Sequence, residues 1–247
     1  MDQPIESPPF KHFETTQWTL VLRAGVEAAD GGRQALNDLI EAYWYPLYAF
    51  CRRQGNMHHD AMDLTQGFFA HFLTNELLAH VSPEKGRFRS FLLASFKNFM
   101  ANQRRSAETI RRGGDVATLS LTTVDFETHY DREPIDDASP EQVFERRWVE
   151  SLLARVRVRL AEDYRRAGKD ELFRTLEPHL VGGATSTPRA EVSRTLKLST
   201  AAVAMSIHRM RRRFGELLRQ EVAATVDNPA DVDDELQHLM AVVGRTM

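Results

Sequence analysis

The chain has 247 residues, of which 42% are hydrophobic, enough to bury a core in one or two domains. It contains no apolar run of about 18 residues, which argues against a membrane span, and its acidic, proline-containing start lacks an apolar signal segment. The one cysteine, Cys51, cannot form an internal disulfide, so we expect a cytoplasmic protein.

The overall net charge of −3 hides an uneven distribution. Residues 85–112 carry 8 basic and 1 acidic side chains, and residues 189–222 carry 8 basic and 3 acidic ones. Between these basic islands, residues 115–145 carry 1 basic and 9 acidic side chains. Such asymmetry indicates a nucleic-acid partner, because clustered Lys and Arg neutralise phosphates. An ordinary solvated charged surface is the alternative interpretation.

Residues 15–112 are predicted to form one all-helical domain. After a break at residues 30–32, apolar residues recur every three or four positions from residue 33 to 50, which predicts a first helix. A second helix is expected from about 59 to 78, and a third from 88 to 105. On the third helix Phe88, Leu92, Phe96 and Phe99 share the inward face. The opposite face holds cations and amides, which can contact phosphates and base edges. The candidate DNA-binding residues there are Lys97, Asn98, Asn102, Arg104 and Arg105.

Residues 113–140 are acidic, lack periodicity and are predicted to be a flexible linker. The second domain, residues 141–222, begins with a long helix whose inward residues are Phe144, Trp148, Leu152, Val156 and Leu160. A short helix from 188 to 196, a turn at 197–199 and a helix from 200 to 221 match a helix-turn-helix, whose second helix enters the major groove. Its outward candidate DNA-binding residues are Ala201, Met205, His208, Arg209 and Arg212. Residues 223–247 are predicted to form an acidic docking helix. The fold class is therefore all-α, with two helical domains joined by an acidic linker.

The ordered set of motifs resembles a known family. These motifs are YPLYAFCRR (45–53), DAMDLTQGFF (60–69), GRFRSFLL (86–93), FERRW (144–148), FGELLR (214–219) and VDDELQHL (232–239). Together they span almost the whole chain and are similar to the extracytoplasmic-function (ECF) group of bacterial RNA polymerase sigma factors, within the sigma-70 family.

The resemblance implies a transcription initiation factor rather than an enzyme. The first domain would be region 2, which binds the polymerase clamp and opens the minus-ten element, and the second would be region 4, which reads the minus-thirty-five element. The implied partners are bacterial core RNA polymerase and promoter DNA, with an anti-sigma factor or a protein kinase as a regulator, and no cofactor is implied. The implied polymerase-binding residues are Asp60, Asp63, Leu64, Gln66 and Phe68.

Two positions depart from the family. Met62 and Gly67 stand where family members usually carry Glu, which weakens the acidic face expected to meet the clamp. One hypothesis is that a kinase restores the missing charge by phosphorylating Thr65, since a phosphate adds about −1.5 to −2 charges. The alternative is that Thr65 is a buried helix residue.

Other functions have weaker support in the sequence. His58, His59, Asp60 and Asp63 are close in sequence, but no further ligand has supporting spacing, so no metal site is predicted. No catalytic residues, nucleophile elbow or glycine-rich phosphate loop are found. A stand-alone helix-turn-helix regulator remains the main alternative, although it leaves residues 60–69 and the first basic island without a role. A helical hydrolase is the third candidate.

Overall fold

The computed structural model describes residues 30–73, 87–109, 127, 130, 137–180, 188–226 and 228–244. Over these residues the fold is all-α, as predicted, with eight α-helices and no strand. None of the described helices is both long and apolar enough to cross a membrane. The helices are α2 (Asp30–Arg53), α3 (His58–Leu73), α4 (Phe88–Thr109), α6 (Pro140–Arg166), α7 (Asp170–Leu176), α8 (Arg189–Leu196), α9 (Thr200–Ala223) and α10 (Val232–Gly244).

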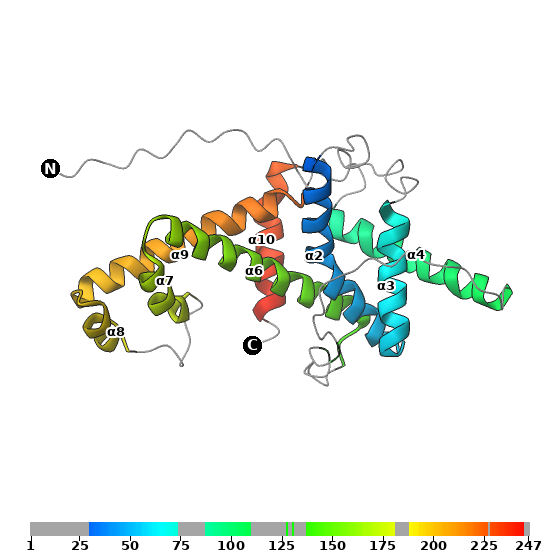
Figure 1. Ribbon diagram of the computed structural model, residues 1–247, viewed down its shortest axis with the longest axis horizontal. Coiled ribbons are helices and arrows are strands. Elements are labelled where there is room, and N and C mark those ends of the chain that lie inside the picture. The colour runs from blue at the N-terminus through cyan, green and yellow to red at the C-terminus, as the bar shows by residue number, and fades with distance from the viewer. Residues whose placement is uncertain are drawn as a thin grey trace.

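Helix α6 runs through the middle of the molecule and joins two hydrophobic cores (Figure 1). Helices α2, α3 and α4 gather at one end of α6, and α7, α8 and the first half of α9 at the other. Helix α10 crosses the centre and packs against α6 and α9. The first core therefore takes residues from both sides of the predicted linker, and the division into two domains stays a prediction.

The first core is built largely from aromatic side chains. Tyr43 of α2 lies between Phe88 of α4, with ring centroids 5.6 Å apart, and Trp148 of α6, at 6.4 Å. Phe68 of α3 contacts Phe96 of α4 at 5.1 Å between centroids. Because aromatic rings bury large apolar areas, these contacts hold three helices against the start of α6.

One expectation about α2 was wrong: the helix begins at Asp30, so the Asp30-Gly31-Gly32 sequence opens the helix rather than breaking the chain. Pro46 lies inside the helix without ending it. A proline in a helix interior costs about 3 kcal/mol. Burial of its neighbours Trp44, Leu47 and Tyr48 in the first core offsets that cost.

The beginning of α6 is fixed by a capping box. Ser139 caps the helix: its Oγ accepts a hydrogen bond from the Gln142 amide at 3.2 Å, and the Gln142 side chain accepts one from the Ser139 amide at 2.8 Å. The predicted inward stripe is confirmed, since all five of its residues are buried: Phe144, Trp148, Leu152, Val156 and Leu160. The first three join the first core and the last two join the second.

Most of the predicted linker, and the predicted extension of α3 from residue 74 to 78, lie outside the described residues. Of the linker, Tyr130 packs against Tyr48 with ring centroids 6.2 Å apart, and its ring centroid lies 4.8 Å from the Arg52 guanidinium carbon. This part of the linker therefore packs against α2 at Tyr48 and Arg52.

Candidate nucleic-acid interface

Helices α8 and α9 are joined by a tight three-residue turn, Lys197 to Ser199. Lys197 adopts a left-handed conformation with φ 54°, which ends α8. Ser199 then caps α9, with its Oγ accepting a hydrogen bond from the Ala202 amide at 3.1 Å. The predicted turn is thus present, and each of its ends has a local physical cause.

The outward face of α9 matches the prediction residue by residue. The inward stripe Val203, Ile207 and Met210 is buried. The outward residues are all exposed: Ala201, Met205, His208, Arg209 and Arg212. Small residues near the start of this face and basic ones after them allow close approach to a polyanion.

Four arginines near the middle of α9 divide into two kinds. Arg211 donates two hydrogen bonds to the His179 carbonyl oxygen, at 3.0 and 2.7 Å, and Arg213 donates two to Asp163 Oδ2, at 2.9 and 2.7 Å. Among the described residues, Arg212 makes only an exposed pair with Glu216 of the same helix, with Nε and Oε1 3.4 Å apart. Arg209 has no hydrogen bond or ion pair to any described residue. The outward cations of α9 are therefore Arg209 and Arg212.

On α4, four of the five predicted residues are exposed: Asn98, Asn102, Arg104 and Arg105. Arg105 donates a hydrogen bond to Asn102 Oδ1 at 2.8 Å, so this pair forms one polar unit on the outer end of the helix. Lys97 is different. Its Nζ lies 2.6 Å from Glu141 Oε1 of α6, and the hydrogen bond from Lys97 lowers the pKa of Glu141 below its ordinary value. Lys97 therefore holds α4 against α6 here instead of projecting freely.

The start of the first basic island has a structural role that the sequence analysis missed. Arg89 is 4% exposed; it pairs with Glu235 of α10 and lies 3.3 Å from Glu145 of α6. Arg87 Nε lies 2.9 Å from the other oxygen of Glu235. Two cations of the first basic island are thus neutralised by carboxylates of the same chain. Local sequence carried no signal for this, since Glu235 lies 146 positions from Arg89.

The predicted polymerase-binding residues on α3 do not share one environment. Asp60 and Asp63 are exposed, and Leu64 and Gln66 are partly exposed. Phe68 is completely buried, so its assignment as a contact residue was wrong; it supports α3 from beneath through the first core. Thr65 is also completely buried, and its Oγ1 donates to the Ala61 carbonyl at 2.7 Å. A kinase cannot reach this hydroxyl in the folded chain, which removes Thr65 as a phosphorylation switch.

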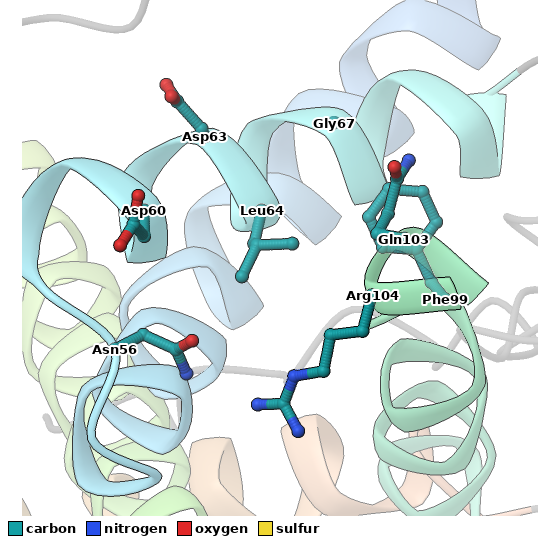
Figure 2. A pocket seen from close by; sticks show the side chains of 8 residues that line it. All are labelled: Asn56, Asp60, Asp63, Leu64, Gly67, Phe99, Gln103 and Arg104. Carbon is teal, nitrogen blue, oxygen red and sulfur yellow. The ribbon is translucent and has the colours of Figure 1, made fainter. Parts of the chain in front are cut away.

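A hollow of about 390 Å³ lies between α3 and α4 (Figure 2). Its lining residues are Asn56, Asp60, Asp63, Leu64, Gly67, Phe99, Gln103 and Arg104. Figure 2 shows the two carboxylates on α3 and the Arg104 side chain reaching from α4 toward the space beneath them. The fold thereby brings acidic residues predicted for polymerase together with a cation predicted for DNA, which no sequence spacing could indicate.

Gly67 keeps this hollow open on one side. A Cβ at that position would lie 3.4 Å from Phe99 Cζ, so even a small side chain would sit directly against the aromatic ring. Asn56, Phe99 and Gln103 also line the hollow but were not among the predicted site residues. The amide and aromatic residue types of this set suit either a basic side chain or a base.

The histidine cluster does not assemble into a metal site within the described part of the chain, where no three potential ligands come together. His58 Nδ1 instead lies 2.8 Å from the Tyr48 hydroxyl oxygen, in hydrogen-bond contact. Cys51 is completely buried, and burial raises the pKa of its thiol to about 12. Hydrogen bonding accounts for the position of His58, and packing in the core accounts for that of Cys51.

Comparisons with protein-family models, curated proteins and solved structures gave no match to this chain. The function of the chain is therefore inferred from the motifs quoted above and from the geometry of α3, α4 and α9.

Proposed function

We propose that this chain is an RNA polymerase sigma factor of the ECF group. In this proposal α9 reads the upstream promoter element, the outer end of α4 contacts the minus-ten region, and the acidic face of α3 meets the polymerase clamp. The chain catalyses no reaction itself; it supplies promoter specificity to the core enzyme in the cytoplasm.

The observation that carries the proposal is the outward face of α9. A helix that follows a three-residue turn buries one apolar stripe and leaves Met205, His208, Arg209 and Arg212 toward solvent. This combination of a rigid helix and an exposed basic face is what major-groove binding requires. Asp60 and Asp63 support the polymerase part of the proposal, because two exposed carboxylates one turn apart on α3 can pair with a basic surface.

Regulation by an anti-sigma factor or by a kinase acting elsewhere on the chain remains part of the proposal. A Thr65→Glu variant is expected to lose helical structure, since it would place a charge in the first core. That loss, measured by circular dichroism, separates a buried structural residue from a surface switch.

The test is a pull-down of bacterial core polymerase with the full-length chain, followed by transcription from a promoter library. The proposal requires binding and initiation from a defined subset of promoters. On a dependent promoter, Arg212→Ala and His208→Ala should each weaken recognition by about 5- to 150-fold, the range of one lost base contact. Arg166→Ala is the matched control, because Arg166 lies at the exposed end of α6 and pairs with Glu162 of the same helix.

A chain that binds its DNA site tightly at physiological salt without polymerase would instead be a stand-alone regulator. We expect the free chain to bind duplex DNA weakly, because acidic segments compete with phosphate for the same cations. Initiation that is equally efficient with wild type and both α9 variants would contradict the assigned face.

A further inference from the structure

A second hollow, of about 300 Å³, lies where the end of α6 meets the side of α9. It is lined by Asp163, Tyr164, Ala167, Lys169, Leu172, Ser206, Arg209 and Arg213. Ser206 and Arg209 belong to α9 and are one turn apart, so the hollow borders the outward face of that helix. Lys169 comes from the connection between α6 and α7.

The charges in this hollow do not balance. Its one acidic residue, Asp163, already accepts two hydrogen bonds from Arg213. Lys169 and Arg209 are both exposed, and neither has an acidic partner among the residues that the structure describes. The hollow therefore has two positive charges in excess, which favours an anion.

Neutral donors line the same space. Burial raises the pKa of Tyr164, although the nearby Arg209 charge opposes the shift, so its hydroxyl stays protonated at neutral pH and can donate a hydrogen bond. The Ser206 hydroxyl is a further donor. Two cations and two hydroxyls around a small hollow fit a tetrahedral oxyanion better than they fit a planar base edge.

The turn that carries Lys169 is locked in place. Gly168 adopts φ 67°, and its amide donates to the Arg165 carbonyl at 3.0 Å, while the Lys169 amide donates to the Tyr164 carbonyl at 2.8 Å. This pair of bonds is the Schellman arrangement, which fixes the backbone after a helix end. The Lys169 backbone therefore needs little ordering when an anion binds, which lowers the entropic cost of the contact.

We propose that this hollow binds a phosphate of the DNA backbone, at the edge of the groove that α9 enters. The inference rests on the proposed role of α9 and deepens it. It assigns Lys169 to the interface and moves Arg209 from base reading to phosphate binding. Base recognition then falls to Ala201, Met205, His208 and Arg212.

The test measures binding of the full-length chain to a duplex of random sequence over a range of salt concentrations. Each lost phosphate contact reduces the slope of log affinity against log salt by about 0.9. A fourfold rise in salt should therefore weaken wild-type binding about 3.5-fold more than it weakens Lys169→Gln. Lys169→Arg should keep the wild-type slope. Arg165→Gln is the matched control, because Arg165 is an exposed cation at the same turn whose side chain already pairs with Glu162.

Arg209→Gln provides an independent check. If the proposal holds, this variant weakens promoter and random duplexes by the same factor, as expected for a phosphate contact. A wild-type slope for Lys169→Gln, an equal slope change for Arg165→Gln, or a change of sequence preference in Arg209→Gln would each overturn the proposal.

These measurements use only the chain and DNA, so they are separable from the polymerase assay. A chain that fails to join polymerase but shows the Lys169 slope change retains the phosphate subsite and loses the sigma-factor assignment. A chain that initiates transcription while Lys169→Gln keeps the wild-type slope loses the subsite alone.

Discussion

Replacing Glu235 of α10 by Gln tests whether the buried charges around α4 hold the molecule together. Glu235 is completely buried, with Arg89 on one carboxylate oxygen and Arg87 Nε 2.9 Å from the other. The Arg87 contact is an ion pair without hydrogen-bond geometry, so the second oxygen relies on charge attraction. Gln keeps the size of the side chain but removes the charge and turns a donor toward one of the two guanidinium groups.

The expected cost follows from what each arginine keeps. Removing one partner of a buried ion pair costs about 3–5 kcal/mol because the other charge is left uncompensated. Here Arg89 keeps Glu145 at 3.3 Å, and Arg87, with 39% of its side chain exposed, keeps access to water. We therefore expect the low end of the range, about 3 kcal/mol. For a chain of this length that corresponds to a fall in Tm of about 6–12 °C.

Thermal unfolding followed by circular dichroism measures this fall. Asp234→Asn is the matched control, since it removes the same charge from the neighbouring position, where the side chain is exposed. That variant should unfold within about 2 °C of wild type, as surface substitutions usually do. If Glu235→Gln and Asp234→Asn unfold at the same temperature, the buried network does not stabilise the fold and the reasoning fails.

Three further predictions concern single residues. Because burial raises the pKa of Cys51 to about 12, its thiol should resist alkylation in the folded chain and react only in denaturant; reaction at the rate of a free thiol would contradict this. Burial acts to raise the pKa of Glu145, but the hydrogen bond and charge of His238, together with the Arg89 charge, outweigh it and lower that pKa below 4.5. The charged Glu145 carboxylate therefore stabilises the folded chain fully above pH 4.5, and this stabilisation is lost as the pH falls through the lowered pKa of the folded state. The Tm difference between wild type and Glu145→Gln should accordingly shrink in acid rather than grow. Gly67→Ala should raise Tm by about 2–4 °C through helix propensity, provided that Phe99 accommodates the added methyl group. Gly67→Glu should bind polymerase more tightly than Gly67→Ala, and equal binding by the two variants would show that the missing carboxylate is irrelevant.

The sequence by itself determined the helices and the faces that they bury. The inward stripe of α6, the Ser139 cap and the outward face of α9 all follow from spacing and local hydrogen bonding within one helix. Such features depend on residues a few positions apart, so periodicity is sufficient to predict them. Errors appeared at two places: the Asp30-Gly31-Gly32 sequence opens α2 rather than breaking the chain, and Phe68, assigned to polymerase contact, is completely buried.

The tertiary structure alone decided what the charged side chains do. Arg89 and Lys97 belong to the same basic island, yet one is buried against α10 and the other pairs with α6, across 146 and 44 positions of sequence. Helical phase assigns a side chain to a face but does not say which element packs on that face. Only packing brings Arg104 into one hollow with Asp60 and Asp63. The strength of each charge interaction depends on burial and on the distance to its partner, and both exist only in the folded chain.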